Sequence, residues 1–250
     1  MPIQRTCKII AREQLTADIV SLTLEAGELA RSAKPGQFVN VKCGEGNLLR
    51  RPISICDVEG DTLRIVFQVK GEGTRWLARR GAPHSVDVLG PLGHGYDYPE
   101  TGKVLVVGGG IGVPPMLLAG KQAPGGAVAA LGFRSKEAVI LAEEFERSGI
   151  PVKIASDDGS VGHHGFVDAL VREYLTEDKT IAAVFACGPR PMLKSVYAAA
   201  KEFETPCFVS MEERMGCGVG ACLVCACSVG GHYRHVCKDG PVFNAEEVDW

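Results

Sequence analysis

The sequence lacks the features that would place it in a membrane, outside the cell or on a nucleic acid. Its 27 Lys and Arg residues against 30 Asp and Glu give a formal charge of −3, so no basic surface for nucleic acid is expected. The most apolar run, VLVVGGGIGV, is broken by glycines and is too short for a membrane span. The opening stretch, MPIQRTCKIIAREQLTADIV, lacks the apolar core of a signal peptide. We therefore expect a cytoplasmic protein that binds neither nucleic acid nor membrane.

Cysteine, in contrast, is plentiful, with ten residues in the chain and four of them in MGCGVGACLVCAC (215–227). Cytoplasmic thiols stay reduced, so this cluster indicates a metal site rather than disulfides. Cys217, Cys222 and Cys225 have the C-x4-C-x2-C spacing that plant-type [2Fe–2S] ferredoxins use for three of four ligands. Thiolates are the soft ligands that such clusters select. We predict Cys237 as the fourth ligand, since Cys227 follows Cys225 too closely to face the same cluster.

Two other metal sites compete with this interpretation. A structural zinc site would favour paired C-x2-C knuckles, whereas the first gap here has four residues. His232 and His235 lie near the cysteines and would permit Rieske-like ligation, although a solvated loop is the plainer explanation when four cysteines are available. The adjacent His163 and His164 need not converge on one ion. The [2Fe–2S] cluster therefore remains the preferred prediction.

The first hundred residues have the pattern of an antiparallel β-structure. In DIVSLTLEA, Val20, Leu22 and Leu24 alternate with polar residues, which is typical of a half-buried strand. TLRIVFQV repeats this alternation, and PGQFVNVKC adds a strand behind a Pro-Gly turn. Several short strands at such spacing favour a small barrel.

The pattern changes after GPLGHGYDYPETG, which we interpret as a domain boundary. KVLVV, AVAALGF, VKIAS and AAVFACG are apolar strands, and helical patterns such as KEAVILAEEFERSG and GFVDALVREYL separate them. Strand and helix in alternation predict a parallel sheet with helices on its faces, with TPCFVSM as its last strand. The sequence thus divides into a barrel at 1–98, an α/β domain at 99–210 and a small cysteine-rich domain at 211–250.

A glycine-rich loop follows the first strand of the α/β domain. Gly108, Gly109, Gly110 and Gly112 stand between KVLVV and a predicted helix that begins near two prolines. Glycines at this place let the backbone approach a pyrophosphate, and the helix N-terminus offers unpaired N–H groups. The alternative is a tight strand-to-helix turn without a ligand, because a glycine-rich turn alone is a weak signal. We favour dinucleotide binding.

Two further loops come at strand ends, where ligands of open α/β sheets gather. One is ACGPRPML, in which Cys187, Gly188 and Pro189 are candidates for nucleotide contact. Taken by itself, Cys187 is better explained as a small buried residue. The other is SDDGS, whose Asp157 either meets ribose hydroxyls or belongs to an Asx turn.

Two motifs in the predicted barrel are compatible with a flavin nucleotide. LLRRPISICDVEG places Arg51, Pro52 and Ser54 in an apolar strand, where an arginine fork can bind a diphosphate and a serine hydroxyl a flavin nitrogen. KGEGTRWLARR places Gly73 in a turn with Thr74 positioned to cap a short helix. Each motif alone is more simply an ordinary surface arginine or turn. Together, ahead of a dinucleotide-type domain, they favour a flavin site.

These parts in this order resemble one family, the electron-transfer subunits of the bacterial class 1B dihydroorotate dehydrogenases, which belong to the ferredoxin–NADP reductase superfamily. The resemblance covers essentially the whole chain and is carried by RPIS, GEGT, GGGIGVPP, CGP and ERMGCGVGACLVC…CKDGPVF. It implies an antiparallel six-stranded flavin-binding barrel, a parallel-sheet nucleotide-binding domain and a small C-terminal [2Fe–2S] loop domain. The last motif is the most distinctive one.

The resemblance also implies where the cofactors bind. FAD would be held by residues of three segments, namely Arg51, Pro52, Ile53, Ser54, Val66, Phe67, Gln68, Gly73 and Thr74. The cluster would be held by Cys217, Cys222, Cys225 and Cys237, and NAD+ would be the co-substrate. Ile53 stands where the superfamily usually has a tyrosine, so aromatic stacking on the flavin is not available from this position. The Cys225–Cys237 segment is also shorter than in plant-type ferredoxins.

The activity that the resemblance implies needs no catalytic side chain, because the cofactors carry the chemistry. Electrons would come from a separate FMN-containing dihydroorotate dehydrogenase catalytic subunit, in a heterotetramer with two copies of each chain. One alternative is the flavin subunit of another complex, such as a sulfide dehydrogenase or an NADH-dependent ferredoxin reductase. Relatives with those roles tend to carry an acidic residue in the cluster motif, whereas four cysteines suffice here. A more remote alternative is a non-enzymatic zinc-binding interaction module.

Overall fold

The computed structural model describes residues 2–250, which fall into two compact units. The first contains the chain up to residue 95 together with 212–227 and 233–241. The second contains 96–211 together with 228–232 and 242–250. The cysteine-rich C-terminal segment is thus divided, and most of it packs with the N-terminal barrel. Among residues 2–250, no helix is long and apolar enough to cross a membrane.

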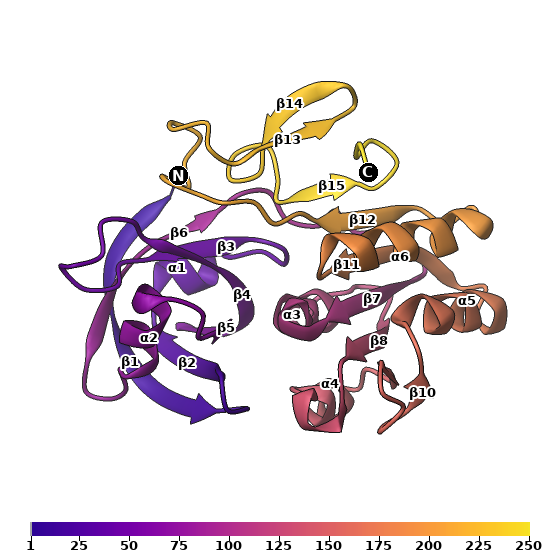
Figure 1. Cartoon of the computed structure of the whole chain (residues 1–250), viewed down its shortest axis with the longest axis horizontal. Coiled ribbons are helices and arrows are strands. Elements are labelled where there is room, and N and C mark those ends of the chain that lie inside the picture. The colour runs from indigo at the N-terminus through magenta and orange to yellow at the C-terminus, as the bar shows by residue number, and fades with distance from the viewer. Residues whose placement is uncertain (1) are drawn as a thin grey trace. The chain divides into compact units, whose positions relative to one another are not determined.

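The first unit is built on a closed barrel in which every neighbouring pair of strands is antiparallel (Figure 1). The strand order is β1-β2-β5-β4-β3-β6. The six strands are β1 (Ile3–Gln14), β2 (Ile19–Glu25), β3 (Phe38–Val41), β4 (Arg51–Glu59), β5 (Thr62–Gln68) and β6 (Ser85–Leu92). Two short helices, α1 (Glu28–Arg31) and α2 (Glu72–Ala78), lie between strands. This confirms the predicted six-stranded barrel.

The apolar residues that alternate along β2 and β5 are buried as predicted, although Ser21 and Val66 on the opposite faces are buried as well. Val20, Leu22 and Leu24 on β2 are buried, and so are Leu63 and Ile65 on the paired strand β5. Burying such side chains contributes about 1.5–3 kcal/mol each. One expectation in this region is wrong. Thr74 does not cap α2, because Gly71 occupies the N-cap and the Thr74 hydroxyl accepts from the Lys70 and Gly71 amides at 3.0 Å.

The second unit is built on a seven-stranded sheet of order β10-β9-β8-β7-β11-β12-β15. All neighbouring strands are parallel except β15, which is antiparallel to β12. TPCFVSM is therefore not the last strand, because a C-terminal strand pairs outside it. The strands are β7 (Lys103–Gly109), β8 (Ala127–Phe133), β9 (Val152–Ser156), β10 (His163–His164), β11 (Ile181–Cys187), β12 (Cys207–Ser210) and β15 (Val242–Asn244).

Four helices cover this sheet, and α5 and α6 pack side by side (Figure 1). They are α3 (Val113–Lys121), α4 (Ala142–Arg147), α5 (Val167–Glu177) and α6 (Arg190–Glu202), with short 3-10 turns at Gly110–Gly112 and Lys136–Ala138. The helical pattern of GFVDALVREYL places Val167, Leu170, Val171 and Tyr174 on one stripe, and all four are buried in α5. The helix expected over KEAVILAEEFERSG is reduced to α4, because Leu141 has a left-handed φ of 62° that ends helical continuity.

The remaining strands, β13 (Ala226–Val229) and β14 (His232–His235), form a two-stranded sheet after the cysteine-rich loop. Gly230 and Gly231 between them both have positive φ, as a two-residue hairpin turn requires. The hairpin returns the chain toward Cys237. Cys225 and Cys237 are thereby brought together, since the Val236 amide donates to the Cys225 carbonyl at 3.0 Å.

Candidate functional site

The four predicted ligand cysteines gather in the first unit as two sulfur pairs. Cys217 and Cys222 share a hydrogen bond between their side chains, and so do Cys225 and Cys237. The consecutive amides of Gly220 and Ala221 link the pairs, because the first donates to Cys237 Sγ at 3.1 Å and the second to Cys217 Sγ at 3.2 Å. Two thiolate pairs are what a two-iron cluster needs, so the donor set fits a [2Fe–2S] group.

Backbone amides surround the sulfurs of this loop. Cys217 Sγ accepts N–H groups from Val219 at 3.4 Å, Ala221 at 3.2 Å and Cys222 at 3.4 Å. Partial burial acts to raise the pKa of Cys217, but these amides outweigh it and lower the pKa to about 6. The site is therefore built to hold Cys217 as a thiolate, which is the ligand form of cysteine.

The second sulfur pair lies deeper than the first. Cys225 and Cys237 are 1% and 3% exposed, whereas Cys222 is exposed. Burial, reinforced by the hydrogen bond with Cys225, raises the pKa of the Cys237 thiol to about 12. Within residues 2–250, no three His, Cys, Asp or Glu side chains surround a single ion position. Cys227 is buried in β13, and its exclusion from the ligand set stays a prediction.

The two predicted flavin motifs meet on the barrel surface. A Cβ placed on Gly73 would lie 2.5 Å from Nε of Arg51 and 2.7 Å from its Cζ, so the guanidinium rests against this glycine. Asn47 Oδ1 accepts from the Arg51 guanidinium at 3.0 Å, and the Leu49 carbonyl accepts a second bond. The structure thus holds the arginine fork beside the GEGT turn. This arrangement fits a diphosphate, since Arg binds such groups bidentately.

The other predicted flavin residues are divided between surface and core. Pro52 is exposed and Ser54 half-buried, whereas Ile53 between them is 7% exposed. Val66 and Phe67 also have side chains in the core, each 4% exposed. These buried residues can offer only their backbone to a ligand at the barrel surface. The half-buried Gln68 donates from Nε2 to Asp18 Oδ2 at 2.6 Å.

The predicted nucleotide loops come together in the second unit. A Cβ on Gly112 would lie 2.3 Å from the Cys187 carbonyl oxygen and 2.7 Å from the Gly188 nitrogen. A Cβ on Gly109 would lie 2.2 Å from the sulfur of Met192 and 3.2 Å from Cδ of Pro189. These glycines therefore let two loops pack in direct contact, and Met192 is a contact that the sequence pattern did not indicate.

The four glycines of the loop have different tasks. Gly108 lies against Val113 at the start of α3, where a Cβ would come within 2.7 Å of the Val113 Cα. Gly110 has a φ of +53° and open space in the Cβ direction. Of these glycines, Gly110 is the one whose missing side chain leaves room for a ligand. Close packing in the turn thus explains Gly108, Gly109 and Gly112, whereas nucleotide binding at Gly110 stays a prediction.

Asp157 follows β9 at the same carboxyl edge of the sheet and is exposed. The Asx turn belongs to the neighbouring Asp158, whose carboxylate accepts from the Ser160 amide at 2.9 Å and hydroxyl at 2.6 Å. These bonds lower the pKa of Asp158. The Asp157 amide donates to the Phe133 carbonyl at 3.0 Å, which fixes the backbone where the loop begins.

The fold is that of the ferredoxin reductases. The structure of an NADH-dependent reduced ferredoxin–NADP oxidoreductase superposes with a TM-score of 0.88 at 31% identity, covering 98% of this chain and 90% of that chain. The ferredoxin reductase of carbazole 1,9a-dioxygenase has the same fold at 18% identity, with a TM-score of 0.69 over 82% of this chain and 67% of that one. The predicted fold class is therefore confirmed.

The particular family follows from two further comparisons. Residues 212–249 match the family model of the iron-sulfur cluster binding domain of dihydroorotate dehydrogenase B. The chain is 42% identical over 255 residues to the dihydroorotate dehydrogenase B (NAD(+)), electron transfer subunit of Geobacillus thermodenitrificans, and 37% identical over 246 residues to that of Caldanaerobacter subterraneus subsp. tengcongensis. Each alignment covers 96% of both chains. The chain belongs to the family of dihydroorotate dehydrogenase B electron transfer subunits.

Proposed function

We propose that this chain is the electron-transfer subunit of a dihydroorotate-oxidising complex, in which it holds a [2Fe–2S] cluster and FAD and delivers electrons to NAD+. The observation that carries the proposal is the pairing of four cysteine sulfurs in the unit that also holds Arg51 against Gly73. A flavin exchanges a hydride with nicotinamide and single electrons with iron–sulfur centres, so this cofactor set links the two kinds of carrier.

The chain's own residues bind and orient the cofactors. We assign the FAD diphosphate to the Arg51 guanidinium and the GEGT turn, and the flavin ring to the exposed edge of β4 at Pro52 and Ser54. The cluster is assigned to the cysteine pairs and their amide donors. NAD+ is assigned to the carboxyl edge of the second sheet, beside Gly110 and the loop that starts at Cys187. Residues 1–98, 99–210 and 211–250 would then serve FAD, NAD+ and cluster binding.

The surface beside the cysteines is suited to a catalytic subunit. The cysteine-rich loop exposes three aliphatic side chains close together in sequence, which is typical of a protein interaction site. They are Val219, Leu223 and Val224, which are 47%, 59% and 57% exposed. Val219 also lines a depression of about 440 Å³, together with residues that include His94, Cys237 and Lys238. We infer that an FMN-containing catalytic subunit docks here, in a cytoplasmic heterotetramer with two copies of each chain.

The solved oxidoreductase at 31% identity supports a second candidate, the flavin subunit of a ferredoxin-linked complex. The curated relatives at 37% and 42% identity favour the dihydroorotate system. The two candidates share the cofactors and differ in the electron donor. A zinc-binding module is the third candidate. The colour of the purified protein distinguishes it from the other two, because a protein with a flavin and an iron–sulfur cluster is brown and a zinc protein is colourless.

The deciding experiment is anaerobic co-expression with an FMN-containing dihydroorotate dehydrogenase subunit, followed by dihydroorotate-driven reduction of NAD+. We expect reduction by the complex and none by either subunit alone. The brown protein could instead oxidise NADH with dyes but neither bind that subunit nor reduce NAD+ with dihydroorotate. The assignment of FAD and the cluster would then be retained, and the assignment of the electron donor would be wrong.

Cys222→Ser tests the place of the cluster in this activity. Cys222 is the most exposed of the four predicted ligands, so its replacement disturbs packing least while removing one thiolate. We expect the variant to lose dihydroorotate-driven NAD+ reduction but keep NADH oxidation with dyes. Cys227→Ser is the matched control and should retain both activities. Unchanged coupled activity in the Cys222 variant would remove the cluster from the mechanism.

A further inference from the structure

Asn40 is a buried polar residue on β3 that no predicted motif includes. Its side chain is in the barrel wall, and the residue is 1% exposed. Nδ2 donates to the carbonyl oxygen of Cys217 at 3.1 Å, so the barrel holds the first ligand cysteine through this amide. Oδ1 is buried without a hydrogen-bond partner among the described residues. Burying an unpaired acceptor is costly, which makes asparagine a poor choice for packing alone.

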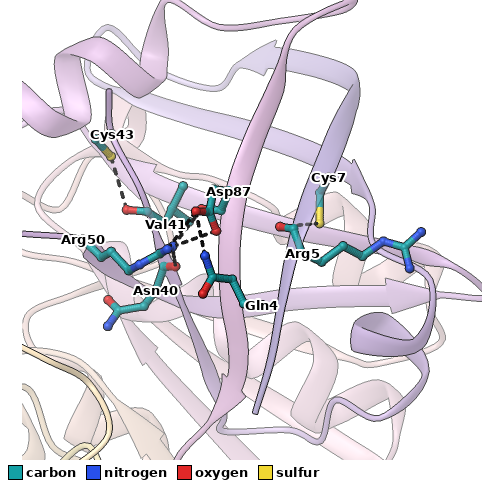
Figure 2. Close-up of polar contacts among 8 residues, drawn as sticks. All are labelled: Gln4, Arg5, Cys7, Asn40, Val41, Cys43, Arg50 and Asp87. Atoms are coloured by element: carbon teal, nitrogen blue, oxygen red, sulfur yellow. Dashed lines mark hydrogen bonds and ion pairs between the residues drawn. The ribbon is translucent and has the colours of Figure 1, made fainter. Parts of the chain in front are cut away.

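A polar network fixes the backbone from which the Asn40 side chain extends (Figure 2). Arg50 Nη1 donates to the Asn40 carbonyl at 3.3 Å. The same guanidinium binds both carboxylate oxygens of Asp87 on β6, at 3.1 and 2.8 Å. Gln4 on β1 donates to Asp87 at 3.0 Å. The side chains of Arg50 and Asp87 are only 21% and 27% exposed, so this ion pair is partly shielded from solvent.

Gly218 is shaped to receive the Asn40 amide. A Cβ at this position would lie 2.2 Å from Nδ2 of Asn40, and its φ is +76°, which favours glycine. The peptide joining Cys217 to Gly218 is trans and planar, so its N–H points away from the carbonyl that Asn40 holds. One side-chain amide thereby sets the orientation of the first peptide in the cysteine loop.

Asn40 also stands next to the flavin motif. In the register of β3 and β4 it is directly opposite Pro52, and Arg50, which holds its carbonyl, precedes Arg51 in the chain. The peptide that it orients leads into the amides that surround Cys217 Sγ. Asn40 therefore connects the strand assigned to FAD with the loop assigned to the cluster.

We propose that Asn40 is a positioning residue for the cluster, which holds the Cys217–Gly218 peptide so that the following amides stay aimed at Cys217 Sγ. The inference rests on the cluster assignment of the proposed function and not on the identity of the partner. Hydrogen bonds to ligand sulfur favour the reduced cluster, because it carries one more negative charge. Without the Asn40 amide, the reduced cluster should be harder to form.

The test is a potentiometric titration of the purified holoprotein, with the reduced cluster followed by electron paramagnetic resonance. Asn40→Leu keeps a similar volume and removes the donor. At a fixed potential, we expect the ratio of reduced to oxidised cluster to fall about tenfold, as loss of one hydrogen bond predicts, with shifted g-values. Iron and FAD content should be unchanged. Ile9→Val is the matched control, since it trims a buried barrel side chain on β1 and should leave the ratio unaltered.

Asn40→Ser decides the outcome if Asn40→Leu fails to fold or to hold iron. Its hydroxyl is too short to reach the Cys217 carbonyl, so the ratio should shift in the same direction. An unchanged ratio and spectrum in Asn40→Ser would overturn the proposal, and so would an equal shift in Ile9→Val. None of these readouts needs dihydroorotate or a second subunit. If the Asn40 variants shift the ratio of reduced to oxidised cluster but the complex does not reduce NAD+ with dihydroorotate, only the proposed function is contradicted. If the wild-type protein holds no iron, the proposed function and the role of Asn40 are both contradicted.

Discussion

Gly112 is a position where one added methyl group tests the assigned nucleotide site. In Gly112→Ala the new Cβ would lie 2.3 Å from the Cys187 carbonyl oxygen and 2.5 Å from its carbonyl carbon. Ordinary contact begins near 3.4 Å, so the glycine loop and the Cys187 loop must separate by roughly 1 Å. Both sides are backbone, and neither can relieve the clash by changing a rotamer. Overpacking of this kind costs about 1–3 kcal/mol of folding stability.

The functional consequence should exceed the loss of stability. If NAD+ binds across these loops, a displacement of that size misplaces the nicotinamide, and kcat/KM for NADH should fall by about 100-fold. The assay is steady-state NADH oxidation with a dye acceptor, run beside urea unfolding. FAD content should be normal, because the barrel is in the other unit.

Gly120→Ala, on the helix α3 that begins directly after Gly112, is the matched control. Its one close contact would be with the flexible end of Ile150, at 2.7 Å, whereas the Cβ of Ala127 lies at an ordinary 3.7 Å. We expect near-normal NADH kinetics from this variant. If Gly112→Ala retains kcat/KM for NADH within twofold of the wild type, the two loops do not form the nucleotide site.

Two other predictions concern single side chains. Arg51→Lys keeps the positive charge but loses the forked guanidinium, so the affinity for FAD should fall about tenfold in a dissociation assay. Arg31→Lys is the control, because Arg31 belongs to an exposed ion pair and its replacement should leave the affinity for FAD unchanged. Normal FAD affinity in Arg51→Lys would contradict the diphosphate assignment. Burial raises the pKa of Tyr174 to about 12, above the unfolded value near 10. Its contribution to stability is therefore complete below pH 10 and is lost as the pH rises toward 12. The difference in absorbance at 295 nm between wild type and Tyr174→Phe should show one phenol ionising near pH 12, and ionisation near pH 10 would refute this.

Local patterns in the sequence predicted strands, helices and their buried faces where neighbouring residues alone determine them. Alternation in β2 and β5 predicted that Leu22, Leu24, Leu63 and Ile65 are buried, because a strand places successive residues on opposite faces. It did not predict that Ser21 and Val66, on the opposite faces, are buried as well. The stripe on α5 was predicted for the same reason, with the helical period. The prediction of one helix over KEAVILAEEFERSG was wrong, because the left-handed backbone at Leu141 leaves no signature in a helical pattern.

The sequence by itself determined the chemistry available to this protein: the cysteine spacing, the arginine fork, the glycine-rich turn and the order of the two folds. These are properties of residue type and spacing along the chain. Only the tertiary structure decided which of these groups meet. Arg51 against Gly73, Gly112 against Cys187 and Asn40 against Cys217 are contacts between distant segments. Such contacts depend on strand register and close packing, which no single stretch of sequence encodes.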